Sequence, residues 1–93
     1  MLIQHRQTGT KGSFYVVNGE DTVAEMTYTM PAANKLIIDH TEVDPSLSGK
    51  GVGLQLLHTA VEFARTNSFK IIPLCPFAKS VFEKKKEYGD VLN

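Results

Sequence analysis

The pattern of polar and apolar positions in the first 43 residues indicates four β-strands. The clearest segment is 22–30, in which every second residue is apolar and most of the others are polar. Segment 2–7 is a short candidate strand, segment 13–18 contains β-branched and aromatic residues, and segment 35–43 is apolar at its start and polar at its end. Short connections containing Gly, Asn or Pro separate the four segments, so we expect hairpin turns between them. The pattern predicts an antiparallel meander of four strands.

The second half of the chain changes to a helical period. A glycine-rich loop over residues 48–53 leads into a segment in which apolar residues recur every three or four positions. Residues 70–75 form a fifth apolar strand, and Pro76 is well placed to open a short helix that ends near residue 87. This order of strands and helices predicts an α+β fold in which the helices pack on the sheet. The apolar stripe of the first helix is expected to contain Leu54, Leu57, Val61 and Ala64, widened by Leu56, Ala60 and Phe63.

Length and composition restrict the class of protein. The 93 residues correspond to one domain, which we expect to span residues 1–93. A hydrophobic content of 42% and zero net charge argue against a disordered chain, and the apolar runs are too short for a membrane span. Ten basic and ten acidic residues argue against binding to nucleic acid through its phosphates. With no visible signal peptide and a single cysteine, we expect a cytoplasmic protein that is a monomer or a weak dimer.

Three glycines lie between the fourth strand and the first helix, at positions 49, 51 and 53. Glycines at such a place let backbone N–H groups turn toward an anion, and the helix dipole adds partial positive charge. The P-loop pattern is not met, because Gly49-Lys50 is followed by glycine and not by Ser or Thr. The dinucleotide fingerprint is not met either, because the spacing is G-x-G-x-G. The loop is therefore a candidate anion site of another kind, or a helix-capping turn without a ligand.

The sequence Ser48-Gly49-Lys50-Gly51-Val52-Gly53 resembles the pyrophosphate loop of the GCN5-related N-acetyltransferases. That family's signature is Gln or Arg, two residues, Gly, one residue, then Gly or Ala, and Gly51 and Gly53 occupy its two small positions. Ser48 stands where Gln or Arg is usual, so one side-chain contact with the pyrophosphate is expected to be absent or weaker. Segments 40–43 and 72–77 resemble blocks of a very small subgroup of this family. The resemblance covers the whole chain and implies a minimal form of the family's fold, without the helices that wall the acceptor side.

The resemblance implies an acetyl-CoA-dependent N-acetyltransferase. Acetyl-CoA would be the co-substrate, and the acceptor would be an amine of a small molecule or a protein, a lysine side chain among them. The backbone of residues 41–43 would hydrogen-bond the pantetheine arm like an added strand, and loop 48–53 would hold the pyrophosphate. Residues 75–77 and Phe82 would flank the arm on its other side. The implied cofactor-binding residues are Thr41, Glu42, Val43, Ser48, Gly49, Lys50, Gly51, Val52, Gly53, Pro76, Phe77, Lys79, Phe82 and Lys84.

Two of these residues, Lys79 and Lys84, are candidate partners for the outlying phosphate of coenzyme A. Lys79 and the run Lys84-Lys85-Lys86 make the C-terminal half of the chain mildly positive. The alternative for such a run is a solvated helix face with no ligand. The sequence leaves both interpretations open.

His40 and Cys75 are the candidate catalytic residues. Acetyl transfer from a thioester needs a deprotonated amine, a stabilised oxyanion and a proton for the leaving thiolate. His40 lies in the polar end of the fourth strand, whereas His5 and His58 are expected to be solvated. Cys75 immediately precedes a predicted helix, whose N-terminus favours the thiolate. The resemblance implies that His40 and Cys75 form a reactive pair across a gap between the fourth and fifth strands.

Both candidates also have structural interpretations, His40 as a hydrogen-bonded strand residue and Cys75 as an inert core residue. If catalytic, Cys75 could take the acetyl group covalently, or it could protonate the leaving thiolate while the amine attacks directly. The histidines and Cys75 do not show recognised metal-ligand spacing, so we expect no metal site. The alternative function is a non-catalytic module that binds acyl-CoA or a partner protein on the same scaffold.

Overall fold

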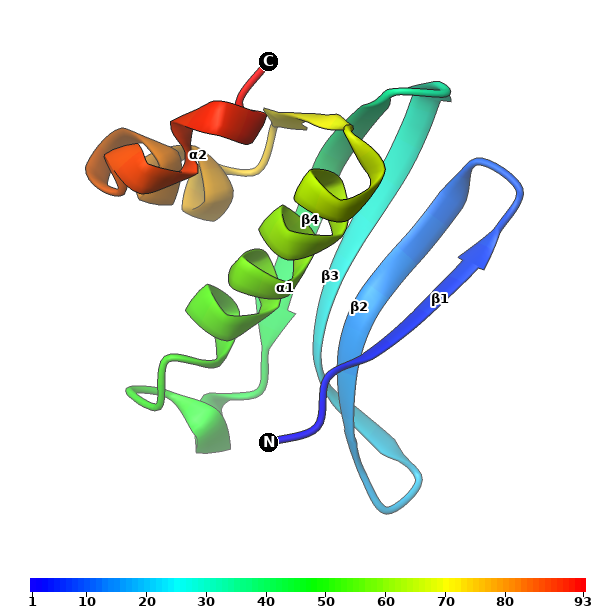
Figure 1. The fold of residues 1–93 in the computed structure, drawn as a ribbon. Helices are drawn as coiled ribbons and strands as arrows, with labels where there is room; N and C mark the ends of the chain where they lie inside the picture. Colours follow the sequence, from blue (N-terminus) through cyan, green and yellow to red (C-terminus); the bar gives the residue numbers. More distant parts are fainter.

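The computed structural model describes residues 1–93 as a five-stranded sheet with helices packed on one of its faces (Figure 1). The strands lie in the order β1-β2-β3-β4-β5, so the sheet order follows the chain order. The first four are antiparallel neighbours, whereas β5 is parallel to β4 because a helix carries the chain back between them. The predicted α+β fold with a four-strand meander is confirmed. The strands are β1 (Gln4–Thr8), β2 (Lys11–Asn18), β3 (Asp21–Ala32), β4 (Lys35–Val43) and β5 (Lys70–Pro73).

Two α-helices and two short 3-10 helices complete the chain. α1 (Val52–Asn67) follows η1 (Pro45–Leu47), and α2 (Pro76–Lys84) is followed by η2 (Lys86–Val91). None of the helices combines the length and the apolar character that crossing a membrane requires. Leu54, expected in the apolar stripe of α1, is instead 36% exposed. The buried face of α1 is made of Val52, Leu56, Leu57, Ala60, Val61 and Ala64.

The core lies between α1 and one face of the sheet. In β3 the apolar residues that the alternation assigns to one face are buried, and the residues between them are half-buried on the other face. Burying a large apolar side chain contributes about 1.5–3 kcal/mol, so this face determines the side on which α1 packs. The opposite face of the sheet carries no helix (Figure 1). The buried residues of β3 are Ala24, Met26, Tyr28 and Met30.

A β-bulge in β4 decides which of its side chains reach the core. Ile38 and His40 pair with consecutive residues of β3, so Asp39 between them has no partner of its own. The hydroxyl of Thr29 donates a hydrogen bond to Asp39 Oδ2 at 2.8 Å and thereby holds the extra residue. An extra residue inverts the alternation of a strand. Ile38 is buried before the bulge, and after it Thr41, not His40, pairs with a buried methionine of β3.

Two element ends differ from the sequence prediction. The turn expected over residues 31–34 is shorter, because β3 continues through Ala32 with an irregular register in which Pro31 needs no ladder hydrogen bond. α2 ends at Lys84 instead of near residue 87. Tyr88, which follows the predicted helix in the sequence, is buried within η2.

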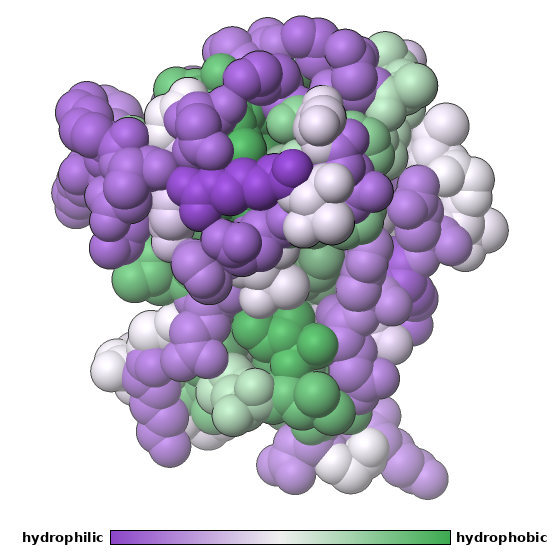
Figure 2. Space-filling view, in the orientation of Figure 1, coloured by the Kyte–Doolittle hydropathy of each residue, from purple (hydrophilic) through white to green (hydrophobic).

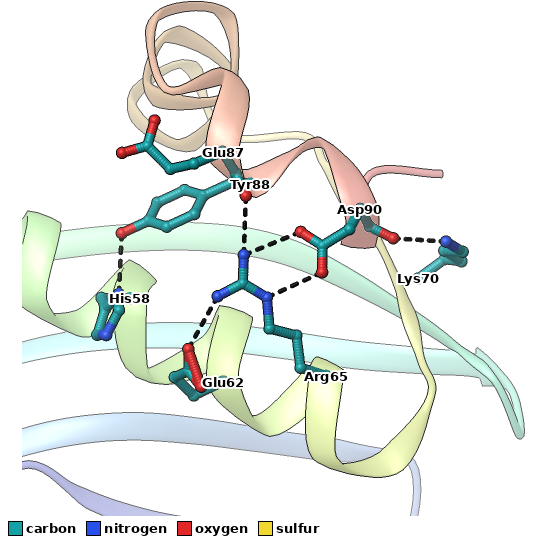
Figure 3. A network of polar contacts seen from close by, with 7 residues as sticks. All are labelled: His58, Glu62, Arg65, Lys70, Glu87, Tyr88 and Asp90. Atoms are coloured by element: carbon teal, nitrogen blue, oxygen red, sulfur yellow. Dashed lines mark hydrogen bonds and ion pairs between the residues drawn. The ribbon is translucent and has the colours of Figure 1, made fainter.

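A polar network centred on Arg65 holds η2 against α1 (Figure 3). The Arg65 guanidinium donates to both carboxylate oxygens of Asp90 at 2.9 Å, to the Glu87 carbonyl at 2.8 Å and to Glu62 at 2.9 Å. These hydrogen bonds lower the pKa of Asp90, because they stabilise its charged form. The ammonium of Lys70 donates to the Asp90 carbonyl at 2.5 Å. The network ties the C-terminal segment to the last turns of α1.

His5 and His58 are both exposed, as the sequence predicts, and each also contacts a tyrosine hydroxyl. His58 Nδ1 lies 3.0 Å from the Tyr88 hydroxyl, which links α1 to η2 (Figure 3). The His5 ring stacks on Phe14 with 4.3 Å between centroids, and its Nε2 lies 2.5 Å from the Tyr28 hydroxyl. Although His5 as a residue is exposed at the sheet edge, burial of its ring lowers its pKa from the ordinary 6.5.

We therefore expect the protein to lose stability as the pH falls from about 7.5 to about 5.5. The unfolded chain binds a proton at His5 near pH 6.5, whereas the folded chain resists it, so the free energy of unfolding decreases below that pH. His5→Phe keeps a ring against Phe14 and removes the proton site. This variant should therefore lose less stability than the wild type over the same fall in pH. Thermal unfolding of both proteins at the two pH values tests this.

Tyr28→Phe is the control for this measurement. It removes the hydroxyl partner but leaves the His5 ring buried, so it should lower stability at both pH values and keep the acid sensitivity. An equal acid-induced loss in the wild type and in His5→Phe would contradict the assignment to His5.

Candidate functional site

β4 and β5 separate halfway along β4, and the sequence-based expectation of a gap between them is met. They pair from Lys35–Lys70 to Ile38–Pro73. Beyond that point the backbone N–H groups of Leu74 and Cys75 both donate to the Ile38 carbonyl, at 3.1 and 3.3 Å, and the chain turns away into α2. The outer edge of β4 after Ile38 therefore has no strand partner. An open strand edge of this kind can hydrogen-bond an extended ligand.

Cys75 lies at the head of this gap. Its Sγ is 3.3 Å from Thr41 Oγ1, the side chain that the bulge turns toward the core side of β4. The same sulfur accepts a hydrogen bond from the Ala78 N–H at 3.4 Å and so acts as the N-cap of α2. Pro76 follows at the first helical position, where its missing N–H costs nothing. The thiol is 6% exposed and is fixed by the strand on one side and the helix on the other.

His40 does not form the expected pair with Cys75, which contacts Thr41 instead. The bulge at Asp39 places His40 opposite Thr27 on the face of the sheet that no helix covers, where it is exposed. Alternation without a bulge would have placed His40 on the same face as Ile38. Glu42 lies on the uncovered face as well, directly across from Glu25. The acidic and imidazole groups of β4 are therefore on one face, and the thiol is on the other.

The glycine turn leaves the N-terminus of α1 open. Gly49 and Gly51 have φ values of +80° and +70°, in the left-handed region that favours glycine. Gly51 is the N-cap of α1 and supplies no side-chain hydrogen bond, so the N–H groups of the first helical turn have no capping side chain. The N–H groups of Ser48 and Lys50 already donate to the carbonyls of η1 at 3.0 and 3.2 Å. The donors available to an anion are therefore those at the start of the helix.

One hollow of about 360 Å³ joins the open edge of β4 to this helix start. Phe77, at the beginning of α2, forms its wall beside Gly53. A Cβ atom at Gly53 would lie 3.0 Å from the Phe77 ring, so the absence of a side chain there lets the two helices approach. The hollow is lined by Thr41, Val43, Leu47, Ser48, Gly49, Gly51, Val52, Gly53, Leu54 and Phe77.

The remaining predicted residues lie outside this hollow. Phe82 is 5% exposed and packs in the core, in edge contact with Tyr88. Lys79 and Lys84 are exposed on α2, whereas Lys85 is half-buried on the side of α2 that carries its apolar residues. The spacing of four between Val81 and Lys85 accounts for this partial burial. No three His, Cys, Asp or Glu side chains are close enough together to hold a metal ion.

Comparisons with known proteins place this arrangement in a family. Residues 13–91 match the sequence model of a family described as GCN5-related N-acetyl-transferase. A GCN5-like protein from Staphylococcus aureus, solved by NMR, is 43% identical; the match covers 97% of this chain and 87% of that one, with a TM-score of 0.77. The chain belongs to the GCN5-related N-acetyltransferase family. Its members are N-acetyltransferases that use acetyl-CoA as co-substrate, which confirms the class of enzyme that the sequence predicts.

Solved structures of lower sequence identity share the fold. The ribosomal-protein-S18-alanine N-acetyltransferase of Escherichia coli is 14% identical, with 84% of this chain and 53% of that chain covered and a TM-score of 0.68. A GNAT family acetyltransferase from Elizabethkingia anophelis with acetyl-CoA bound is 12% identical, with 83% and 53% covered and a TM-score of 0.63. The match thus spans about half the length of these two enzymes. No curated protein sequence matches the chain.

Proposed function

We propose that this protein binds acetyl-CoA in the gap between β4 and β5 and transfers the acetyl group to an amine. The observation that supports this is one continuous hollow, which runs from the open edge of β4 to the uncapped N-terminus of α1. An extended thiol-bearing arm fits the edge, and a pyrophosphate fits the helix start. The Elizabethkingia anophelis enzyme, which has acetyl-CoA bound, shares this fold.

Each part of the hollow has a role in this proposal. The backbone of residues 41–43 hydrogen-bonds the pantetheine arm along the edge where β5 has left the sheet. The amides of residues 51–53 hold the pyrophosphate, aided by the helix dipole. Phe77 covers the arm from the side of α2, while Pro76 fixes the direction in which that helix starts.

In this proposal Cys75 acts on the acetyl group at the end of the arm by one of two routes. In the covalent route its sulfur attacks the acetyl carbonyl carbon, an acetyl–sulfur bond forms, and the coenzyme A thiolate leaves with the thiol proton. The amine then attacks this new thioester and releases the Cys75 thiol. In the direct route the amine attacks acetyl-CoA itself, and Cys75 only protonates the leaving thiolate. Thr41 Oγ1, 3.3 Å from the sulfur, orients the thiol in both routes.

His40 is the candidate base for the acceptor amine, acting from the uncovered face of the sheet. It is exposed there and has no helix above it, so an amine of a small molecule or of a protein lysine can reach it. Glu25 and Glu42 are direct cross-strand neighbours on the same face. Two like charges in that position repel each other, and a cationic amine relieves the repulsion.

The experiment that tests the function measures acetyl-CoA turnover against a panel of small amines and lysine peptides. With an accepted amine, Cys75→Ala and His40→Gln should each lower turnover about 100-fold or more, the usual contribution of a positioned acid or base. Cys75→Ser is the matched variant, because serine keeps the N-cap hydrogen bond of α2 and removes the thiol. If Cys75→Ser matches the wild type in both folding and turnover, Cys75 is only a cap.

Mass spectrometry separates the two routes. The active protein is incubated with acetyl-CoA without amine, quenched in acid, and the peptide that contains Cys75 is examined for one added acetyl group. In the covalent route this adduct forms and is discharged by amine no more slowly than turnover. An unmodified Cys75 in an active preparation assigns the direct route. Absence of both turnover and coenzyme binding would contradict the function itself.

A further inference from the structure

An apolar strip lies on the uncovered face of the sheet, directly beside the gap between β4 and β5. It is formed by Ile37 of β4, Ile72 of β5 and Leu74, which follows β5. We propose that this strip holds the hydrocarbon tail of medium-chain acyl-CoA donors, and that the protein transfers these acyl groups as well as acetyl. This inference rests on the proposed binding of acetyl-CoA in the gap.

Strand pairing places the two isoleucines of the strip side by side. Ile37 pairs with Ile72 across the parallel ladder of β4 and β5, and both are half-buried. The core residues next to them in each strand are fully buried on the helix side, so alternation puts the isoleucines on the opposite face. Thr29 of β3 pairs with Ile37 on its other side, so the apolar surface ends there.

Leu74 joins this pair to the head of the gap. Its side chain belongs to a residue that is 57% exposed, although the next residue, Cys75, is buried. The Leu74 N–H donates to the Ile38 carbonyl at 3.1 Å, which fixes the residue at the point where the two strands separate. An exposed leucine at this place leaves apolar surface that a hydrocarbon chain can cover.

The gap gives a longer acyl chain only one direction to follow. The donor reaches the gap from the helix side, where the hollow lies between Thr41 and Phe77. Beside Cys75 that side is filled by the core, so carbons beyond the thioester carbonyl continue toward the uncovered face, which carries no helix (Figure 1). The apolar surface that Figure 2 shows near the N-terminus lies on the helix side and is separate from the strip.

The strip has the length of a medium acyl chain. Ile72 lies three positions before Cys75, about 10 Å away in extended backbone. An extended octanoyl chain has a similar length, since each of its carbon–carbon bonds is about 1.5 Å long. An acetyl group ends at the head of the gap and does not reach the isoleucines. Affinity should therefore rise with chain length, because each added methylene covers more apolar surface.

Longer acyl groups react by the same bond changes as the acetyl group. The amine nitrogen attacks the thioester carbonyl carbon, a carbon–nitrogen bond forms, and the carbon–sulfur bond breaks. The coenzyme A thiolate takes up the proton that the amine loses. The hydrocarbon tail takes no part in these bonds, so the strip selects the donor by binding it.

The experiment compares octanoyl-CoA with acetyl-CoA, in affinity by calorimetry and in transfer to an amine that is accepted from acetyl-CoA. The wild type should bind octanoyl-CoA at least about tenfold more tightly, and its kcat/KM for octanoyl transfer should be no lower than for acetyl transfer. Leu74→Ser should reduce this affinity ratio at least about threefold, because it removes apolar surface at the head of the strip. Leu74→Met keeps that surface and should keep the ratio.

Val17→Ser is the matched control for the loss of an exposed aliphatic side chain. Val17 is 40% exposed on β2, and β3 and β4 separate it from β5. This variant should keep the affinity ratio of the wild type.

The outcomes distinguish this inference from the proposed function. If the wild type binds both donors equally well, the function stands and the role of the strip is wrong. The inference is also wrong if octanoyl-CoA binds but only inhibits acetyl transfer, or if Leu74→Ser and Val17→Ser change the ratio equally. If neither donor binds to the folded wild type, the proposed function fails together with this inference.

Discussion

Gly51→Val is expected to weaken coenzyme A binding at least about tenfold, or about 1.4 kcal/mol. Gly51 has φ +70°, which a β-branched residue adopts only under strain, so valine should rotate the backbone at the helix start. The amides of the first turn would then no longer converge on the pyrophosphate. A Cβ atom at this position meets nothing within 4 Å, so the loss comes from backbone geometry and not from a clash in the core. Calorimetry with coenzyme A measures it.

Gly19→Val is the matched control for this experiment. Gly19 has φ +67° in the turn between β2 and β3, it also has nothing within 4 Å of its Cβ position, and it lies outside the hollow. The two variants should lose similar stability, and only Gly51→Val should lose coenzyme affinity. Unchanged affinity in a folded Gly51→Val protein would remove the glycine turn from the site.

Gly12→Ala is expected to cause the largest loss of stability, about 1–3 kcal/mol. Gly12 in β2 pairs with Tyr28 in β3, and a Cβ atom there would lie 2.4 Å from Tyr28 Cζ and 2.7 Å from the Arg6 carbonyl oxygen. Neither neighbour can yield easily, because Tyr28 is 1% exposed and the other contact is backbone of β1. Urea denaturation followed by circular dichroism measures the change in unfolding free energy.

Two further variants identify the cause of that loss. Gly9→Ala places a methyl group in open space at φ +61°, so it should cost only backbone strain, about 1 kcal/mol. Tyr28→Phe removes the hydroxyl that a Cβ at Gly12 would contact. The double variant Gly12→Ala with Tyr28→Phe should therefore be less destabilised than the sum of the two single variants. Strict additivity would show that crowding against the Tyr28 hydroxyl is not the cause.

Features that depend on local physics could be predicted from the amino-acid sequence. Alternation over residues 22–30 identified the buried face of β3, because neighbouring side chains of a strand point to opposite faces. The glycines before Val52 marked the start of α1, since two of them adopt conformations that favour glycine. Cys75 before Pro76 marked the head of α2, where the thiol acts as the N-cap. The family resemblance came from the same short segments.

The contacts between side chains from distant segments could not be predicted in this way. The family resemblance implied that His40 faces Cys75, but one unpaired residue, Asp39, inverts the alternation of β4 and brings Thr41 to the thiol instead. Phe82 was expected beside the coenzyme arm, whereas it lies on the buried side of α2 and packs in the core. The periodicity of a segment and its backbone angles depend on residues that are close together in the chain. Its face and its partners depend on register and packing between distant segments, which no local pattern contains.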